Sequence, residues 1–283
     1  MKMRSKVILS VLALVLVVML SLTACNSQSA NNPSQNGAEQ VELTVFAAAS
    51  MTETLEEISG MYAKVAPNVK LIYNFDSSGT LKTQIQEGAY SDLFISAGQR
   101  QMDQLDIAAP ATVNTENLDF VLTPTRIDLL ENQVTLVVPG GNPKNINSFR
   151  DLAAALSDRK VLMAMGNSDV PVGQYTLQIL EYFNLDERAL ASAGVLSYGS
   201  NVKEVTTQVY EASVDCGIVY CTDAFSAGLD VVDTATIDMC GRVIYPAAVL
   251  KESVNQEAAR EFLAYLTSAE AMSVFENVGF SKP

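Results

Sequence analysis

The sequence predicts an α/β fold in which a largely parallel sheet is covered by helices. From Val41 onward, short apolar runs of strand length alternate with segments whose apolar residues recur at three- and four-residue spacing. This alternation is typical of strands that are each followed by a helix. Residues 41–283 are enough for one large or two medium domains, at about 150 residues per domain.

The expected strands follow the apolar runs in order. They cover residues 42–47, 70–75, 92–96, 134–138, 160–165, 195–198, 217–220 and 243–250. Helices with one apolar face are expected between them, for example through Leu55, Ile58 and Tyr62, because these positions share one side of a helix. Two further helices, at 255–267 and 269–277, should close the chain.

Two passages, at 123–133 and 228–242, interrupt the alternation. Such interruptions fit a chain that leaves one lobe, builds a second lobe and returns to the first. We therefore expect residues 41–126 together with 243–283 to form one lobe, and residues 127–242 to form the other.

The chain begins with the features of an export signal. Three basic residues within positions 1–6 precede an uncharged apolar run over 7–20, as in secretory signal peptides. Leu-Thr-Ala-Cys at 22–25 resembles the bacterial lipobox, whose Cys is lipid-modified. We predict a lipoprotein signal peptide over 1–24, lipidation of Cys25 and a flexible tether over 25–40. The alternative is an uncleaved anchor, since the run is about long enough to span a bilayer.

The composition excludes several classes of function. The chain has no His, so it cannot hold a Ser-His-Asp or Cys-His nucleophile system or a His-containing metal site. Its 32 acidic and 18 basic residues give a net charge of −14 without a basic stripe, which argues against nucleic acid as a partner. Cleavage after Ala24 would make the chain more acidic still, because only basic side chains are lost.

Serines follow the first two expected strands. Ser50 and Glu53 form a capping-box pattern at the start of a helix, and Ser78 with Gly79 lies in a segment, 76–80, that precedes the next helix, expected over 81–87. Helix N-termini present free N–H groups and about half a positive charge, which suits an anion. Both helices would start at the carboxyl edge of one sheet, where α/β folds bind ligands. The alternative is that both serines are caps only.

Three later positions could add donors to such a site. Pro171 at a helix start leaves the amide of Val172 free, and Val202 opens the helix after the strand at 195–198. Tyr220 ends a buried strand and offers a neutral O–H. Taken singly, the Pro171 segment is more often an ordinary Pro-started helix, and a tyrosine at a strand end is more often a core residue.

An ordered set of motifs resembles the molybdate-binding proteins that serve molybdate ABC transporters. It comprises VFAAAS at 45–50 with Thr52, SSGTL at 77–81, SDLFISA at 91–97, VPVGQY at 170–175 and GIVYCTDA at 217–224. The similarity covers essentially everything after the tether. The resemblance implies a two-lobed type II periplasmic-binding-protein fold whose lobes close on a tetrahedral oxyanion.

The resemblance also implies which residues hold the oxyanion. Ser50 and Ser78 would bind through hydroxyl and amide, Val172 and Val202 through their amides, and Tyr220 through its hydroxyl. Molybdate would be held by these residues, with no direct metal-ion ligand and no cofactor. Val172 replaces the Ala often found there, which would narrow the pocket.

The implied protein is a monomeric, extracytoplasmic lipoprotein, not an enzyme, that is anchored to the cell membrane. It would deliver molybdate to an ABC permease and its ATPase. A cavity of donors disfavours an anion that carries a proton, such as phosphate, and excludes sulfate by its small size, but it should accept tungstate. One alternative is a receptor for sulfate or thiosulfate. A remote one is a serine hydrolase, for which no activating residue is visible.

The cysteines beyond Cys25 leave one question open. Cys216 and Cys221 lie too far apart along an extended strand, about 16 Å, for a disulfide with each other. A bridge from either one to Cys240 is compatible with the sequence, and an odd count leaves at least one thiol free.

Overall fold

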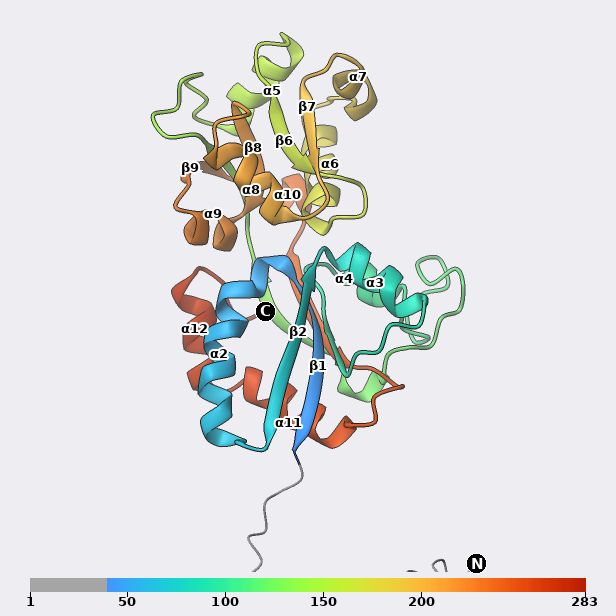
Figure 1. The fold of residues 1–283 in the computed structure, drawn as a ribbon. Helices are drawn as coiled ribbons and strands as arrows, with labels where there is room; N and C mark the ends of the chain where they lie inside the picture. Colours follow the sequence, from blue (N-terminus) through green and yellow to red (C-terminus); the bar gives the residue numbers. More distant parts are fainter. Residues whose placement is uncertain (1–39) are drawn as a thin grey trace, which may run out of the picture. The chain divides into compact units, whose positions relative to one another are not determined.

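The computed structural model describes residues 40–283, in which two five-stranded sheets are flanked by helices (Figure 1). The first sheet has the order β2-β1-β3-β10-β4 and the second the order β7-β6-β8-β5-β9. The strands are β1 (Val41–Ala48), β2 (Val69–Asp76), β3 (Leu93–Ile95), β4 (Ile127–Asn132), β5 (Val134–Val138), β6 (Met163–Gly166), β7 (Leu196–Gly199), β8 (Cys216–Tyr220), β9 (Asp230–Thr234) and β10 (Val243–Val249).

We call residues 40–132 with 243–283 lobe I, because they carry the first sheet, and residues 134–242 lobe II. The helical segments of lobe I are η1 (Ala49–Met51), α2 (Thr52–Val65), α3 (Ser78–Gln86), α4 (Gln99–Asp103), η2 (Thr123–Thr125), α11 (Gln256–Leu266) and α12 (Ala269–Asn277). Those of lobe II are α5 (Phe149–Ser157), α6 (Pro171–Tyr182), α7 (Glu187–Ser192), α8 (Val202–Tyr210), α9 (Cys221–Ala227) and α10 (Ile237–Cys240).

The predicted α/β class is confirmed, but both sheets are mixed. The pairs β1–β2, β1–β3, β6–β7 and β6–β8 are parallel. The pairs that include β5 or β10 are antiparallel. The expectation of largely parallel sheets was therefore too strong, because the strands that follow each crossing between the sheets enter in the reverse direction.

The chain first crosses from lobe I to lobe II later than the expected boundary at residue 127. β4 pairs with β10 in the first sheet, and only Gln133 separates it from β5 in the second. β4 and β9 both fall within or beside the passages where no strand was expected. β9 is largely exposed and carries Asp230 and Asp233, so it lacks the apolar run of a buried strand.

Alternating residues of β1 show how the first sheet is covered on both faces. Val45 belongs to the main core cluster with Leu55 and Ile58 of α2, whereas Phe46 packs in a smaller cluster with Leu81 of α3. This follows from the two-residue period of a strand. Figure 1 shows α2 and α12 on one side of this sheet and α3 with α4 on the other.

Cys216, Cys221 and Cys240 are all free, so residues 40–283 contain no disulfide. Within the same residues, no helix is both long enough and apolar enough to cross a membrane. The predicted signal peptide, the tether up to residue 39 and the lipidation at Cys25 lie outside the described residues.

Candidate functional site

Ser50 lies in η1, immediately after β1, and is 5% exposed. Its hydroxyl pairs with the Tyr245 hydroxyl at 2.9 Å. The predicted capping box with Glu53 is wrong: α2 is capped by Met51 without a side-chain bond, and Glu53 bonds to Lys203 instead. The extra turn of η1 moves Ser50 back from the cap position of α2.

Ser78 is the first residue of α3 and is fully buried. The cap of this helix is Ser77, whose hydroxyl accepts from the Thr80 amide at 3.1 Å. The Ser78 hydroxyl accepts from the Ala97 amide at 2.9 Å. Since a Ser hydroxyl accepts and donates at once, this bond leaves the Ser78 hydrogen for a further acceptor.

Tyr220 ends β8 and is 1% exposed. Its hydroxyl donates a hydrogen bond to the carbonyl oxygen of Ala97 at 3.4 Å, so Ala97 of lobe I contacts both Ser78 and Tyr220. Burial raises the pKa of Tyr220 well above its ordinary value. The phenol therefore stays protonated at neutral pH and acts as an uncharged donor.

Val172 and Val202 occupy the first turns of two helices in lobe II. Val172 follows Pro171 at the start of α6, and Val202 begins α8 behind Asn201, whose side chain accepts from the Glu204 amide at 3.1 Å. Amides in a first helical turn have no partner within their own helix. Both valines are buried, at 0% and 4% exposure, so each amide is screened from bulk solvent.

The two lobes are in backbone contact beside these residues. A Cβ atom built on Gly79 of α3 would lie 2.1 Å from the carbonyl oxygen of Asp169, and one on Gly98 would lie 3.3 Å from Cβ of Pro171. Only a glycine at position 79 allows this close approach to Asp169, because glycine has no Cβ atom. The N-terminus of α3 thus touches the turn that precedes α6, and α8 in turn contacts η1.

The structure therefore brings the elements that carry the five predicted residues to one boundary between the lobes. Three residues are joined through shared neighbours, since Tyr245 contacts both Ser50 and Tyr220, and Ala97 contacts both Ser78 and Tyr220. Val172 and Val202 lie at the helix ends that face this boundary. None of the five is more than 5% exposed, so each is shielded from bulk solvent.

The side chain of Lys203 carries a positive charge close to these residues. Its ammonium group reaches both carboxylate oxygens of Glu53 at 2.8 Å, across the lobe boundary, and lies 3.4 Å from the Asp223 carboxylate. Sequence reasoning missed Lys203 and Asp223. It also missed Tyr245, which lies in an entirely buried strand and has no local motif that points to a site.

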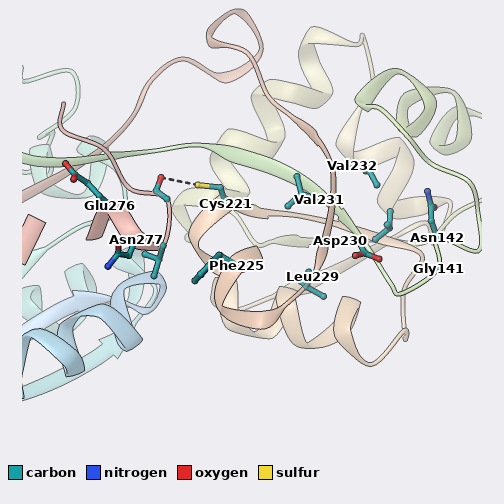
Figure 2. A pocket seen from close by; sticks show the side chains of 13 residues that line it. Gly141, Asn142, Cys221, Phe225, Leu229, Asp230, Val231, Val232, Glu276 and Asn277 are labelled. Carbon is teal, nitrogen blue, oxygen red and sulfur yellow. Dashed lines mark hydrogen bonds between the residues drawn. The ribbon is translucent and has the colours of Figure 1, made fainter. Parts of the chain in front are cut away.

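Two cavities lie close to these residues, and none of the five proposed ligands lines either of them. One of about 570 Å³ is bordered by Gly98 and Pro171 from the two lobes, with Arg100 and Arg242 nearby. The other, of about 830 Å³, is lined by α9, β9 and residues 276–279 (Figure 2), where the Cys221 thiol contacts the Gly279 carbonyl.

The chain matches the family of bacterial extracellular solute-binding proteins over residues 43–281 and belongs to that family. Within it, the chain is a ModA-family periplasmic binding protein. Proteins of this family bind solutes, are not enzymes and carry no cofactor.

Individual relatives cover almost the whole chain. YvgL of Bacillus subtilis (strain 168), provisionally named an ABC transporter substrate-binding lipoprotein, is 33% identical over 96% of this chain and 97% of its own length. Molybdate-binding protein ModA of Haemophilus influenzae is 32% identical over 86% of this chain and 91% of its own length. A solved substrate-binding domain, provisionally assigned to a molybdenum ABC transporter from Clostridium difficile, is 33% identical, with a TM-score of 0.61 over 86% of this chain and all of that chain.

These relationships define the general role of the chain. It is an extracytoplasmic substrate-binding component of an ABC transporter, and its working partners are a permease and an ATPase.

Proposed function

We propose that this protein captures molybdate, and also tungstate, and delivers it to its ABC permease. The observation that supports the proposal most is that the buried hydroxyls of Ser50, Ser78 and Tyr220 are joined through Tyr245 and Ala97 at the boundary between the lobes. The first-turn amides of Val172 and Val202, at helix starts on the same boundary, would complete the set of neutral donors. These five residues are the proposed oxyanion ligands.

Neutral donors are suited to a dianion in a protein whose net charge is negative. Burying a charged group is costly unless it is fully hydrogen-bonded, and each bond to a charged group contributes roughly 1.5–3 kcal/mol. Local dipoles at the starts of α6 and α8 act at short range, so the net charge of −14 does not prevent anion binding. The lobes would close over the anion, and the closed protein would then bind the ABC permease.

The identity of the anion is tested by calorimetric titration of the full-length protein with molybdate, tungstate, sulfate and phosphate. We expect heat with molybdate and tungstate and none with phosphate, which carries a proton at neutral pH. The Ser50→Ala variant should bind molybdate more weakly by a factor of about ten or more, because one hydrogen bond to a charged group is lost. Heat with sulfate and none with molybdate would contradict the proposal.

A receptor for sulfate or thiosulfate is the second candidate. It is considered because Val172 is fully buried and, by the resemblance described above, stands where a smaller Ala is often found. A narrower pocket would suit a smaller tetrahedral anion. Exchange of Val172 for Ala distinguishes the two candidates, since it should improve molybdate binding if the pocket is too tight.

We further propose that Cys25 carries a lipid that holds the protein, as a monomer, at the outer face of the cell membrane. YvgL, which matches 96% of this chain, has a lipoprotein name. A Cys25→Ser variant should move from the membrane fraction to the soluble fraction. Continued membrane association would indicate an uncleaved anchor over residues 7–24 instead.

A further inference from the structure

Tyr245 lies where the two lobes meet, behind the proposed anion ligands. It is fully buried in β10, and its ring packs against Tyr220 of lobe II, with ring centroids 5.7 Å apart, and against Phe280 of lobe I at 5.2 Å. Its hydroxyl is hydrogen-bonded to the side chains of Asn132 and Ser50, and the Tyr220 hydroxyl also lies next to it as a donor. The direction of these two bonds decides what the Ser50 hydroxyl can do.

The orientation of the Asn132 amide is fixed by its other contacts. Its Oδ1 accepts from the Gln133 backbone amide at 2.8 Å and from the Cys221 thiol at 3.1 Å. Its Nδ2 must therefore face Tyr245 at 3.1 Å and Thr222 at 3.0 Å. An amide nitrogen can only donate, so the Tyr245 oxygen accepts from Asn132.

The Tyr245 hydroxyl also carries one hydrogen, which needs an acceptor. Its remaining partner is the Ser50 Oγ at 2.9 Å, and a buried hydroxyl that left its hydrogen unpaired would lose a hydrogen bond without compensation. Burial raises the pKa of Tyr245 well above its ordinary value, so the hydrogen is present at neutral pH. The bond consequently runs from Tyr245 to Ser50.

We propose that Asn132 and Tyr245 are positioning residues that force the Ser50 hydroxyl to act as a donor toward the bound anion. Because Ser50 accepts from Tyr245, its own hydrogen points away from that bond. Ser78 is set in the same way by the Ala97 amide. Both serines can then only donate into the site, which restricts the ligand to oxyanions without a proton. This inference rests on the proposed function, since it explains how that site chooses its ligand class.

The test compares Tyr245→Phe with Tyr175→Phe in the full-length protein. Tyr175 is a matched control, because its ring also packs against Tyr220, at 6.4 Å, but the Asn132–Tyr245–Ser50 chain does not include it. Calorimetry would measure dissociation constants for molybdate and for arsenate, a tetrahedral oxyanion that keeps a proton at neutral pH. We expect Tyr245→Phe to weaken molybdate binding by about tenfold and to reduce the preference for molybdate over arsenate.

A double-mutant cycle separates positioning from general damage. If Tyr245 acts through Ser50, Tyr245→Phe should change molybdate affinity little once Ser50 is already Ala. Additive losses in the cycle, an unchanged molybdate-to-arsenate preference, or an equal effect of Tyr175→Phe would each overturn the inference. If the parent protein binds sulfate but not molybdate, the proposed function fails, while the same cycle run with sulfate still tests the positioning role.

Discussion

Asp223 has an environment unlike that of an ordinary surface carboxylate. It is fully buried in the first turn of α9, and neither carboxylate oxygen has a hydrogen-bond partner. Lys203 lies 3.4 Å away, close enough for attraction but without hydrogen-bond geometry, and it is shared with Glu53. Burial outweighs this attraction and raises the pKa of Asp223 to about 7.

A raised pKa in the folded state makes Asp223 a source of pH-dependent stability. The protonated carboxyl favours folding, so its contribution is fully present below the unfolded pKa, near 3.8, and is lost as the pH rises through about 7. Exchange of Asp223 for Asn should therefore raise the melting temperature at pH 8 by roughly 2–4 °C or more and change it little at pH 4. Thermal unfolding at both pH values measures this. Equal shifts at pH 4 and pH 8 would contradict it.

At the scale of elements, helix starts provide much of the proposed site. α3, α6 and α8 begin at Ser78, Pro171 and Val202, and each first turn faces the boundary between the lobes. Two of the three begin after a side-chain cap, from Ser77 and Asn201. The caps satisfy amides deeper in each first turn and leave the leading amide for another acceptor.

Val202 allows the backbone role to be tested without disturbing α8. Proline is tolerated as the first residue of a helix, and Asn201 already has the extended conformation that a following proline requires, with φ −151° and ψ 173°. Val202→Pro removes the amide donor, whereas Val202→Ala keeps it. We expect the Pro variant to bind molybdate roughly 10- to 150-fold more weakly than the Ala variant. Equal affinities would show that this amide does not touch the ligand.

The sequence predicted these elements well where strands are buried and apolar, and less well elsewhere. β4 contains Asp128 and Glu131 among its apolar residues and β9 is largely exposed, so neither has the buried apolar run of a strand such as β5 or β10. The capping box at Ser50 failed because tertiary contact with Tyr245 and an added turn replaced the local bond. Tyr245 and Asp223 could not be found from sequence, since their partners are distant along the chain.

At the scale of the whole molecule, the contacts between the lobes differ greatly in weight. The ion pair between Lys203 and Glu53 has half-exposed partners, and such pairs contribute about 0–1 kcal/mol. The approach of Gly79 to Asp169 is different, because it is a close contact of backbone with backbone. Steric fit at this point therefore limits how closely the lobes approach, more than the ion pair does.

An added methyl group at Gly79 should thus impair closure without harming α3. Alanine is favourable within a helix, but its Cβ would lie 2.1 Å from the Asp169 oxygen. We expect Gly79→Ala to weaken ligand binding about 5- to 150-fold while the melting temperature of the ligand-free protein is maintained. Gly60→Ala in α2 is the control, since nothing lies within 4 Å of its Cβ. Unchanged affinity in Gly79→Ala would mean that binding does not require this contact.

The free thiols of Cys216, Cys221 and Cys240 are exposed to oxidising conditions in a protein that works outside the cytoplasm. Disulfides form readily there, through the thiolate form of cysteine. Burial raises the pKa of Cys221, of Cys240 to about 11, and of Cys216 further still. At neutral pH each of the three thiols is therefore almost entirely protonated, which slows its oxidation. Burial adds protection for Cys216 and Cys240, whereas the half-buried Cys221 lines a cavity and relies on its raised pKa alone.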